Sequence, residues 1–285
     1  MRKFSLGTFF LDGKYGDHFN EFSPYVNTYY AWFHDGYATS KDRIQDWAPK
    51  FQASCNRAIN AGLDIYLQLG LGSNWAPYLA LGDPKDNIPG TKIKGGMCYP
   101  FWDSIVRIDL ADEPDWSQRD FDHALHLVKK LIRGTGHKKK PLGINYNQSQ
   151  MDKIPDSMIK PLDFVSFEAL VTAPALDSPR QHDAAWAVKK LTATVRHQAA
   201  RCTSLGVPYS VVGMSYDRNY TPGHDKGWSD ASTVAACQMP TYNLIKDDKN
   251  ALGLNWFAYG RPGGMSTHPV ILNECKKIGS IVVST

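Results

Sequence analysis

Three acidic side chains lie close together near the middle of the chain, in the segment 107–114. They are Asp109, Asp112 and Glu113. Two more acids, Glu168 and Asp217, stand at the ends of short apolar runs. A pair of carboxyl groups can cleave a glycosidic bond, because one protonates the leaving oxygen while the other stabilises or captures the oxocarbenium-like centre. These acids therefore predict glycoside hydrolysis, if the fold brings two of them together.

Aromatic and amide side chains stand near the acids along the chain. Among aromatic rings a carboxyl loses solvation, so its pKa rises and it remains a proton donor near neutral pH. Aromatic rings also stack on the apolar faces of sugars, and aromatic residues form 12% of the chain. The residues expected to contact a carbohydrate substrate are Trp32, His34, Asp35, Gln68, Asn145, Tyr146, Tyr216, Trp256 and Tyr259.

Eight short runs rich in β-branched and aromatic residues provide the elements that must position these side chains. Their near-continuous apolar character is typical of parallel strands covered by helices. The runs are residues 4–10, 26–34, 64–72, 105–113, 141–148, 164–170, 209–217 and 252–260.

Segments of helical periodicity separate the runs, most clearly at 40–61, 117–134, 184–205 and 229–244. Ser117 and Asp120 resemble a capping box, and Gly206 stands where a helix C-terminus favours glycine. Eight strand–helix repeats predict an α/β protein, a (β/α)8 TIM barrel that spans residues 1–285 as one domain. An open doubly wound sheet is the structural alternative, disfavoured because no Gly-rich phosphate loop follows the first strand.

Catalytic groups of such barrels project from the C-terminal ends of the strands. The candidate acids and substrate-contacting residues lie along or just after the predicted strands, most of them near these ends, whereas Asp109 stands in the middle of the fourth strand. Strict alternation along the fourth strand predicts that Asp109 and Glu113 face the same side. The long segment 72–102 after the third strand is expected to wall one side of a cleft.

The segment that ends in Asp112-Glu113-Pro114 resembles the strand-four Asn-Glu-Pro signature of the clan A (β/α)8 glycoside hydrolases. This resemblance covers the eight-strand layout and the motif. It implies that Glu113 is the general acid/base and that Trp256 floors the sugar subsite. The sequence departs from the signature at Asp112, which replaces the asparagine.

The seventh strand also departs from the clan, since it has no glutamate where the clan places its nucleophile. We expect Glu168 or Asp217 to act as the second carboxylate. Carboxylates on strands four and six are similar to the pair that the α-galactosidase clan uses.

Two other functions stay open. The adjacent Asp112-Glu113 pair also resembles the β-hexosaminidases, in which the aspartate orients the acetamido group of the substrate as nucleophile; Tyr216 and Trp256 would then contact that group. No His-x-Gly-Gly precedes the pair, a departure from that family.

The absence of a glutamate on the seventh strand is also consistent with a non-catalytic carbohydrate-binding barrel. A metal- or phosphate-dependent enzyme using His34 is disfavoured, because no His-x-His pair or late phosphate loop is present.

Composition excludes several other classes. The formal net charge is +4 and the basic residues form no broad stripe, so we expect no nucleic-acid partner. The five scattered cysteines show no metal-binding spacing, and we expect neither metal nor cofactor. No apolar run approaches the roughly 18 residues of a membrane span, and no secretory leader is evident. We expect a soluble protein, cytoplasmic or released without a signal, for example on a virus particle; the oligomeric state is open.

Overall fold

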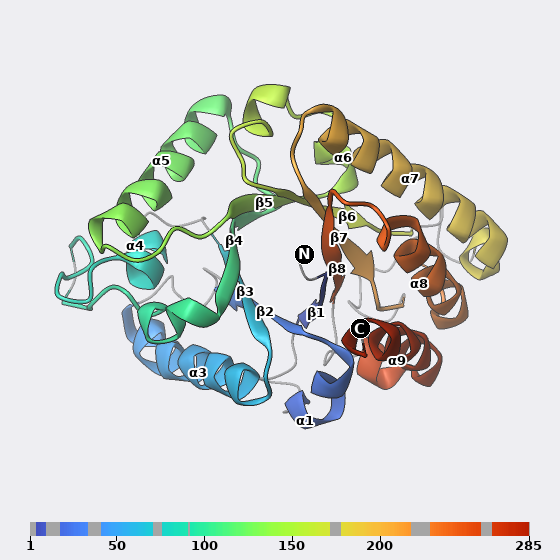
Figure 1. The fold of residues 1–285 in the computed structure, drawn as a ribbon, viewed down its shortest axis with the longest axis horizontal. Coiled ribbons are helices and arrows are strands. Elements are labelled where there is room, and N and C mark those ends of the chain that lie inside the picture. The colour runs from blue at the N-terminus through green and yellow to red at the C-terminus, as the bar shows by residue number, and fades with distance from the viewer. Residues whose placement is uncertain are drawn as a thin grey trace.

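The computed structural model describes residues 4–9, 18–33, 41–70, 76–90, 92–171, 178–217, 229–257 and 264–284. Within them, eight parallel strands follow one another in chain order around a closed barrel (Figure 1). The strands are β1 (Ser5–Phe9), β2 (Thr28–Phe33), β3 (Asp64–Leu69), β4 (Ile105–Asp112), β5 (Leu142–Tyr146), β6 (Val165–Ala169), β7 (Tyr209–Met214) and β8 (Ala251–Phe257). The predicted (β/α)8 barrel is confirmed, and each strand overlaps the run predicted for it.

Helices surround the barrel on its outside (Figure 1). They are α1 (Phe19–Phe22), α3 (Lys41–Asn60), α4 (Ala76–Leu81), α5 (Gln118–Gly134), α6 (Gln148–Met151), α7 (Ala184–Ser204), α8 (Ala231–Ile245) and α9 (Pro269–Val283). Short 3-10 helices are η1 (Ser23–Tyr25), η2 (Tyr99–Ser104), η3 (Asp156–Met158), η4 (Pro179–His182) and η5 (Met265–Thr267). Among the described helices, none is both long and apolar enough to cross a membrane.

Local signals in the sequence fix several helix ends. The capping box is confirmed at α5, where Ser117 and Asp120 satisfy each other's backbone N–H groups. After α7, Gly206 adopts a left-handed conformation with φ 70°, as glycine does at a helix C-terminus.

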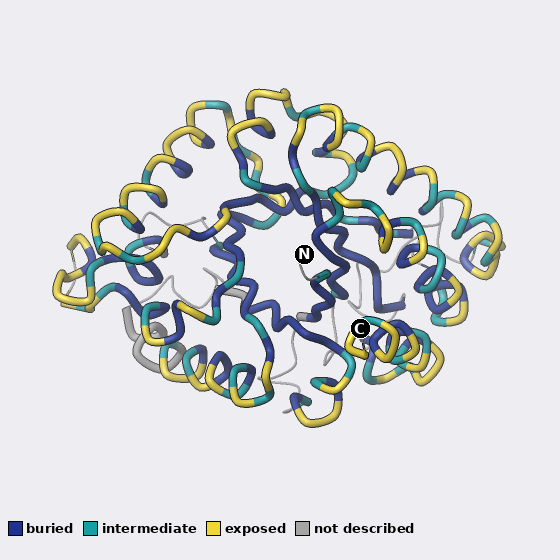
Figure 2. Tube along the Cα trace, viewed as in Figure 1, coloured by how far each residue is buried: buried dark blue, intermediate teal, exposed yellow. Residues whose placement is uncertain are grey.

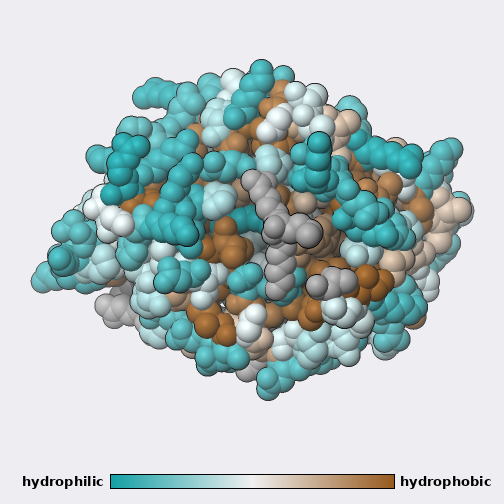
Figure 3. Space-filling view, in the orientation of Figure 1, coloured by the Kyte–Doolittle hydropathy of each residue, from teal (hydrophilic) through white to brown (hydrophobic). Residues whose placement is uncertain are grey.

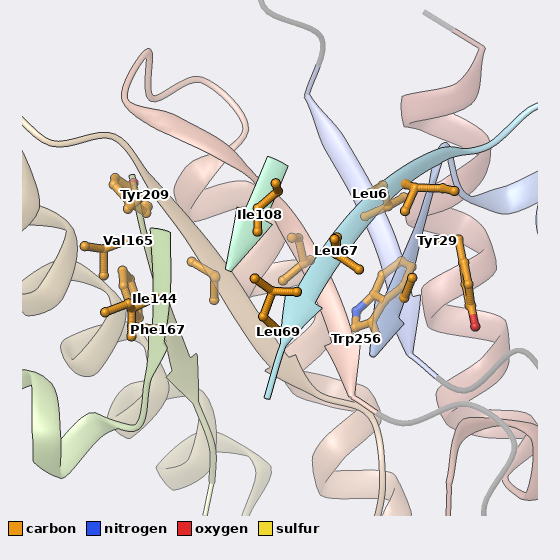
Figure 4. Close-up of a cluster of buried hydrophobic side chains, with 14 of the residues drawn as sticks. Leu6, Tyr29, Leu67, Leu69, Ile108, Ile144, Val165, Phe167, Tyr209 and Trp256 are labelled. Carbon is orange, nitrogen blue, oxygen red and sulfur yellow. The ribbon is translucent and has the colours of Figure 1, made fainter. Parts of the chain in front are cut away.

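Two hydrophobic clusters hold the barrel together. The larger lies between the outer faces of the strands and the helices, and Figure 4 shows part of it. The smaller lies inside the barrel and consists of Tyr30, Tyr66, Phe164, Val212 and Leu252. Burial is accordingly greatest along the strands and on the inward helix faces (Figure 2), while polar residues cover the outer rim of the molecule (Figure 3).

The segment between β3 and β4, predicted to wall a cleft, is described at residues 76–90 and from 92 onward; residues 71–75 lie outside the described residues, so the cleft wall stays a prediction. The buried side chains of the segment include Leu79, Ile88 and Phe101, which belong to the outer hydrophobic cluster. Helix α4 also packs against α5. The described part of this segment therefore fills the helical layer, because its apolar residues are more stable against the strands than beside an open cleft.

Candidate active site

The strand registers determine which inward side chains share a level of the barrel, since alternate strands contribute to one layer. Asp112 and Glu168 share the uppermost described layer, at the C-terminal ends of β4 and β6. Gln68, Asn145 and Val212 lie one layer below. The next layer down holds Tyr30, Asp109, Ser166 and Asn255.

A bulge in β4 aims Asp112 into the barrel. Asp109 is in register with Gly143 on β5, whereas Asp112 is in register with Asn145, so three steps along β4 match two along β5. The extra residue reverses the alternation of side chains. Asp112 therefore faces Asn145, and the strict alternation predicted for this strand is wrong.

Glu113 follows the bulge in a strained conformation. Its φ of 46° makes it the one non-glycine residue with positive φ among those described. Such a backbone costs about 1–3 kcal/mol and is commonest at functional sites. The Glu113 N–H donates to the carbonyl of Asn145 at 2.8 Å, which holds the strained turn in place.

The carboxyl groups of Glu113 and Glu168 meet. They interact by a side-chain hydrogen bond, and Glu168 is the more buried of the two. Burial raises the pKa of Glu168 well above its ordinary value of 4.5, and the charges of Glu113 and Asp112 raise it further. Burial and the neighbouring acids thus favour the protonated form of Glu168. No group of three or more acidic, His or Cys side chains in the described chain is arranged to hold a metal ion.

Asn145 joins the acids from below. Its Nδ2 donates to Oδ1 of Asp112 at 2.7 Å and lies 3.4 Å from Oε1 of Glu168. Gln68, which we also expected at the site, lies in the same layer with both amide atoms buried and without hydrogen-bond partners; Asn255 is in the same condition one layer lower. Buried amide side chains therefore form the layers of the barrel beneath the acids.

Trp256 lies on the opposite side of β8 from this site. It is fully buried in the outer cluster (Figure 4), and its indole Nε1 donates to Oε1 of Gln238 on α8 at 3.0 Å. Asn255 and Phe257 face the barrel interior instead, since Phe257 packs against the inner cluster. The prediction that Trp256 forms the floor of the sugar subsite is therefore wrong. Only every second side chain of β8 faces inward, and Trp256 is not one of them.

Tyr216 follows β7 and is buried with its ring edge against Phe257, the centroids 5.8 Å apart. Phe257, which the sequence analysis missed, is the half-buried aromatic ring on this side of the barrel. The inward position of Asn255 two residues earlier is the signal that would have identified it. The hexosaminidase resemblance implies that Tyr216 and Trp256 contact the acetamido group of the substrate. Because Trp256 lies in the helical layer, it cannot make that contact.

Asp217 and Tyr146 have contacts of other kinds. Oδ1 of Asp217 lies 3.2 Å from Nε2 of His268, which precedes α9. The Tyr146 ring belongs to the outer cluster, and burial raises the pKa of its phenol. Of the two predicted second carboxylates, Glu168 is the one with a described hydrogen bond to Glu113, while a catalytic role for Asp217 stays a prediction.

Four predicted residues have no described side chain. His34, Asp35 and Tyr259 lie outside the described residues, and Trp32 lies on β2 with only its backbone described.

Gln150 is a supporting residue that the sequence analysis missed. Its Nε2 donates to the carbonyls of Glu113 at 2.9 Å and Pro114 at 3.2 Å. Its Oε1 accepts from the N–H of Asn147, completing a capping box at the start of α6. The Asn147-x-x-Gln150 spacing was the available signal. This box fixes the segment that carries Glu113.

Comparison with solved structures finds barrels of the same fold. A β-glucuronidase from Ruminococcus gnavus aligns with a TM-score of 0.59 and 10% identity over 98% of this chain and 50% of its own, so this chain spans half its length. A complex of a GH113 β-1,4-mannanase gives 0.54 and 11% over 100% of both chains. XacCel5A in complex with cellopentaose gives 0.58 and 14% over 97% and 99%.

Comparisons of the sequence with protein families and with curated proteins find no match. At 10–14% identity, the structural likeness establishes the architecture and leaves the chemistry to be argued from the residues. The chain is a (β/α)8 barrel with the fold of these glycoside hydrolases.

Proposed function

We propose that this protein is a glycoside hydrolase in which Glu113 and Glu168 form the catalytic pair. The contact between their carboxyl groups at the C-terminal ends of β4 and β6 carries the proposal. Inverting enzymes separate their carboxyls by about 6.5–9.5 Å to admit water, whereas retaining enzymes hold them about 5 Å apart. Two carboxyls in direct contact support retention.

The raised pKa of Glu168 supports one assignment of roles. Protonated Glu168 donates to the glycosidic oxygen, while the Glu113 carboxylate attacks the anomeric carbon and forms a glycosyl ester. Glu168, now ionised, takes a proton from water, which attacks the ester and releases the sugar. This assignment reverses the clan A resemblance, which makes Glu113 the acid/base, because burial favours the protonated form of Glu168.

The substrate class follows from the structural neighbours and the site. The neighbours are named for β-1,4-mannan and β-glucuronide cleavage or hold cellopentaose, and they share this barrel. Phe257 and Tyr216 provide an aromatic side to the barrel near the acids. We therefore expect a carbohydrate substrate with a β-linkage.

Trapping with aryl 2-deoxy-2-fluoro-β-glycosides tests the assignment. Activity is first measured on β-1,4-mannan, cellopentaose and aryl β-glycosides, including the glucuronide and the N-acetylglucosaminide. Mass spectrometry of the trapped enzyme should place the sugar on Glu113. The Glu113→Gln and Glu168→Gln variants should each lose at least about a thousandfold in kcat, while Glu274→Gln, at an ion pair on α9, serves as control.

Three outcomes would contradict parts of this proposal. A sugar trapped on Glu168 restores the roles that the clan A resemblance implies. Turnover of the N-acetylglucosaminide alone, without trapping, favours substrate-assisted cleavage with Asp112 held by Asn145. Glycan binding without turnover of any of these substrates leaves a carbohydrate-binding barrel.

A further inference from the structure

We propose that Asp109 is a positioning residue whose charge, from beneath the catalytic pair, sets the pH range in which Glu168 keeps its proton. The inference rests on the proposed function. It concerns a buried acid to which the reaction itself gives no role.

Asp109 is held rigidly on the inner face of β4. It is fully buried, and the Tyr30 hydroxyl on β2 donates to its Oδ2. Tyr66 on β3 also hydrogen-bonds to it, and the Tyr66 hydroxyl lies 2.6 Å from the Oγ of Ser166 on β6. The Tyr30 and Tyr66 rings pack with centroids 4.3 Å apart. Asp109 therefore cannot swing toward solvent to relieve its charge.

Charged groups above and below Asp109 influence its pKa. Asp112 stands above it on the same strand and raises its pKa, while Arg107 below lowers it. Arg107 is turned away toward Ser210 and the Leu252 carbonyl. The charge of Asp109 in turn raises the pKa values of Tyr30, Tyr66 and Tyr146. Burial is the largest influence and raises the pKa of Asp109 from 3.8 to about 7.

A layer of buried amide side chains lies between the level of Asp109 and the level of Glu168. Oδ1 of Asp109, both amide atoms of its register neighbour Gln68 and Oδ1 of Asn145 are buried without hydrogen-bond partners. A protonated Asp109 can donate from Oδ1 to one of these amide oxygens. The Nδ2 of the same Asn145 holds Asp112 and Glu168. When Asp109 ionises, its charge instead disfavours ionisation of both acids above it, so Glu168 holds its proton to higher pH.

The Asp109→Asn variant isolates this effect, because asparagine has the same shape, still accepts from Tyr30 and never ionises. At pH 5 the wild-type Asp109 is neutral, so kcat/KM of the variant should match wild type within about twofold. At pH 8 the variant lacks the buried charge. The alkaline limb of its pH profile should fall by about one pH unit, which lowers kcat/KM about tenfold at pH 8.

Asp248→Asn is the matched control. Its carboxylate also accepts from a tyrosine, Tyr209 at 2.7 Å, but it precedes β8 at the other end of the barrel. This variant should keep the wild-type profile. A loss of kcat/KM in Asp109→Asn that is equal at pH 5 and pH 8 would indicate a structural role and overturn the proposal.

NMR titration of 13C-labelled glutamate carboxyls provides a readout independent of turnover. The Glu168 signal is identified by its loss in Glu168→Gln. The Glu168 titration should move to lower pH in Asp109→Asn, and identical titrations in both proteins overturn the proposal. If the titration moves although no glycoside is cleaved by the wild type, the link between the acids stands and the hydrolase function fails.

Discussion

Replacing Trp256 by phenylalanine should lower stability and leave catalysis intact. The indole is fully buried between β8 and α8, and its Nε1 donates to Oε1 of Gln238. The Nε2 of that glutamine is already used, since it donates to the carbonyls of Met214 and Val234. The amide is therefore fixed and cannot rotate to find a new donor without breaking these bonds.

The cost follows from two contributions. Phenylalanine is smaller than tryptophan by about 40 Å³, which at about 24 cal/mol per Å³ costs about 1 kcal/mol. Loss of the indole donor leaves a buried amide oxygen and costs about 2 kcal/mol more. An unfolding entropy of about 2 cal/mol/K per residue gives about 0.6 kcal/mol/K for this chain, so a loss of about 3 kcal/mol lowers Tm by about 5 °C.

Differential scanning calorimetry and steady-state kinetics on the best aryl glycoside of the panel measure the two effects. Trp256→Phe should change kcat/KM by less than about threefold, because the indole faces away from the site. Phe257→Ala, its neighbour on the inner face, should lower kcat/KM about tenfold or more. A large kinetic loss in Trp256→Phe with an unchanged Tm would refute the assignment of the two faces of β8.

Substitutions at two other positions test the backbone of the barrel. Glu113→Gly and Glu113→Ala both remove the carboxylate and should both be inactive, but the glycine variant should be more stable by about 0.5–1 kcal/mol, because alanine keeps the strain of φ 46°. Equal urea midpoints and m-values for the two would show that the left-handed turn stores no strain. Gly143→Ala should destabilise by about 1–3 kcal/mol, because its Cβ would overlap the Phe164 ring inside the barrel. A Gly143→Ala protein with wild-type Tm would mean that Phe164 moves freely, contrary to its full burial.

The sequence by itself determined the architecture. Eight apolar runs separated by helical periodicity predict a barrel, because each strand buries both faces and each helix buries one. The capping box at Ser117 and the glycine after α7 are equally local, since they depend on neighbouring backbone groups. Glu113 and Glu168 were identified for the same reason: their places at strand ends follow from chain order once the barrel is assumed.

Only the tertiary structure decided how the site is built. The β4 bulge depends on pairing with β5 and reverses the alternation on which the sequence analysis relied. The preference for Glu168 over Asp217 depends on the contact of Glu168 with Glu113, which lies 55 positions earlier in the sequence and meets it only in the fold. The raised pKa values of Glu168 and Asp109 are consequences mainly of burial, which no single residue's neighbours in sequence can set. Strand register, contacts between distant residues and the local dielectric are all properties of the packed barrel. They arise only when segments far apart in the sequence come together and exclude water.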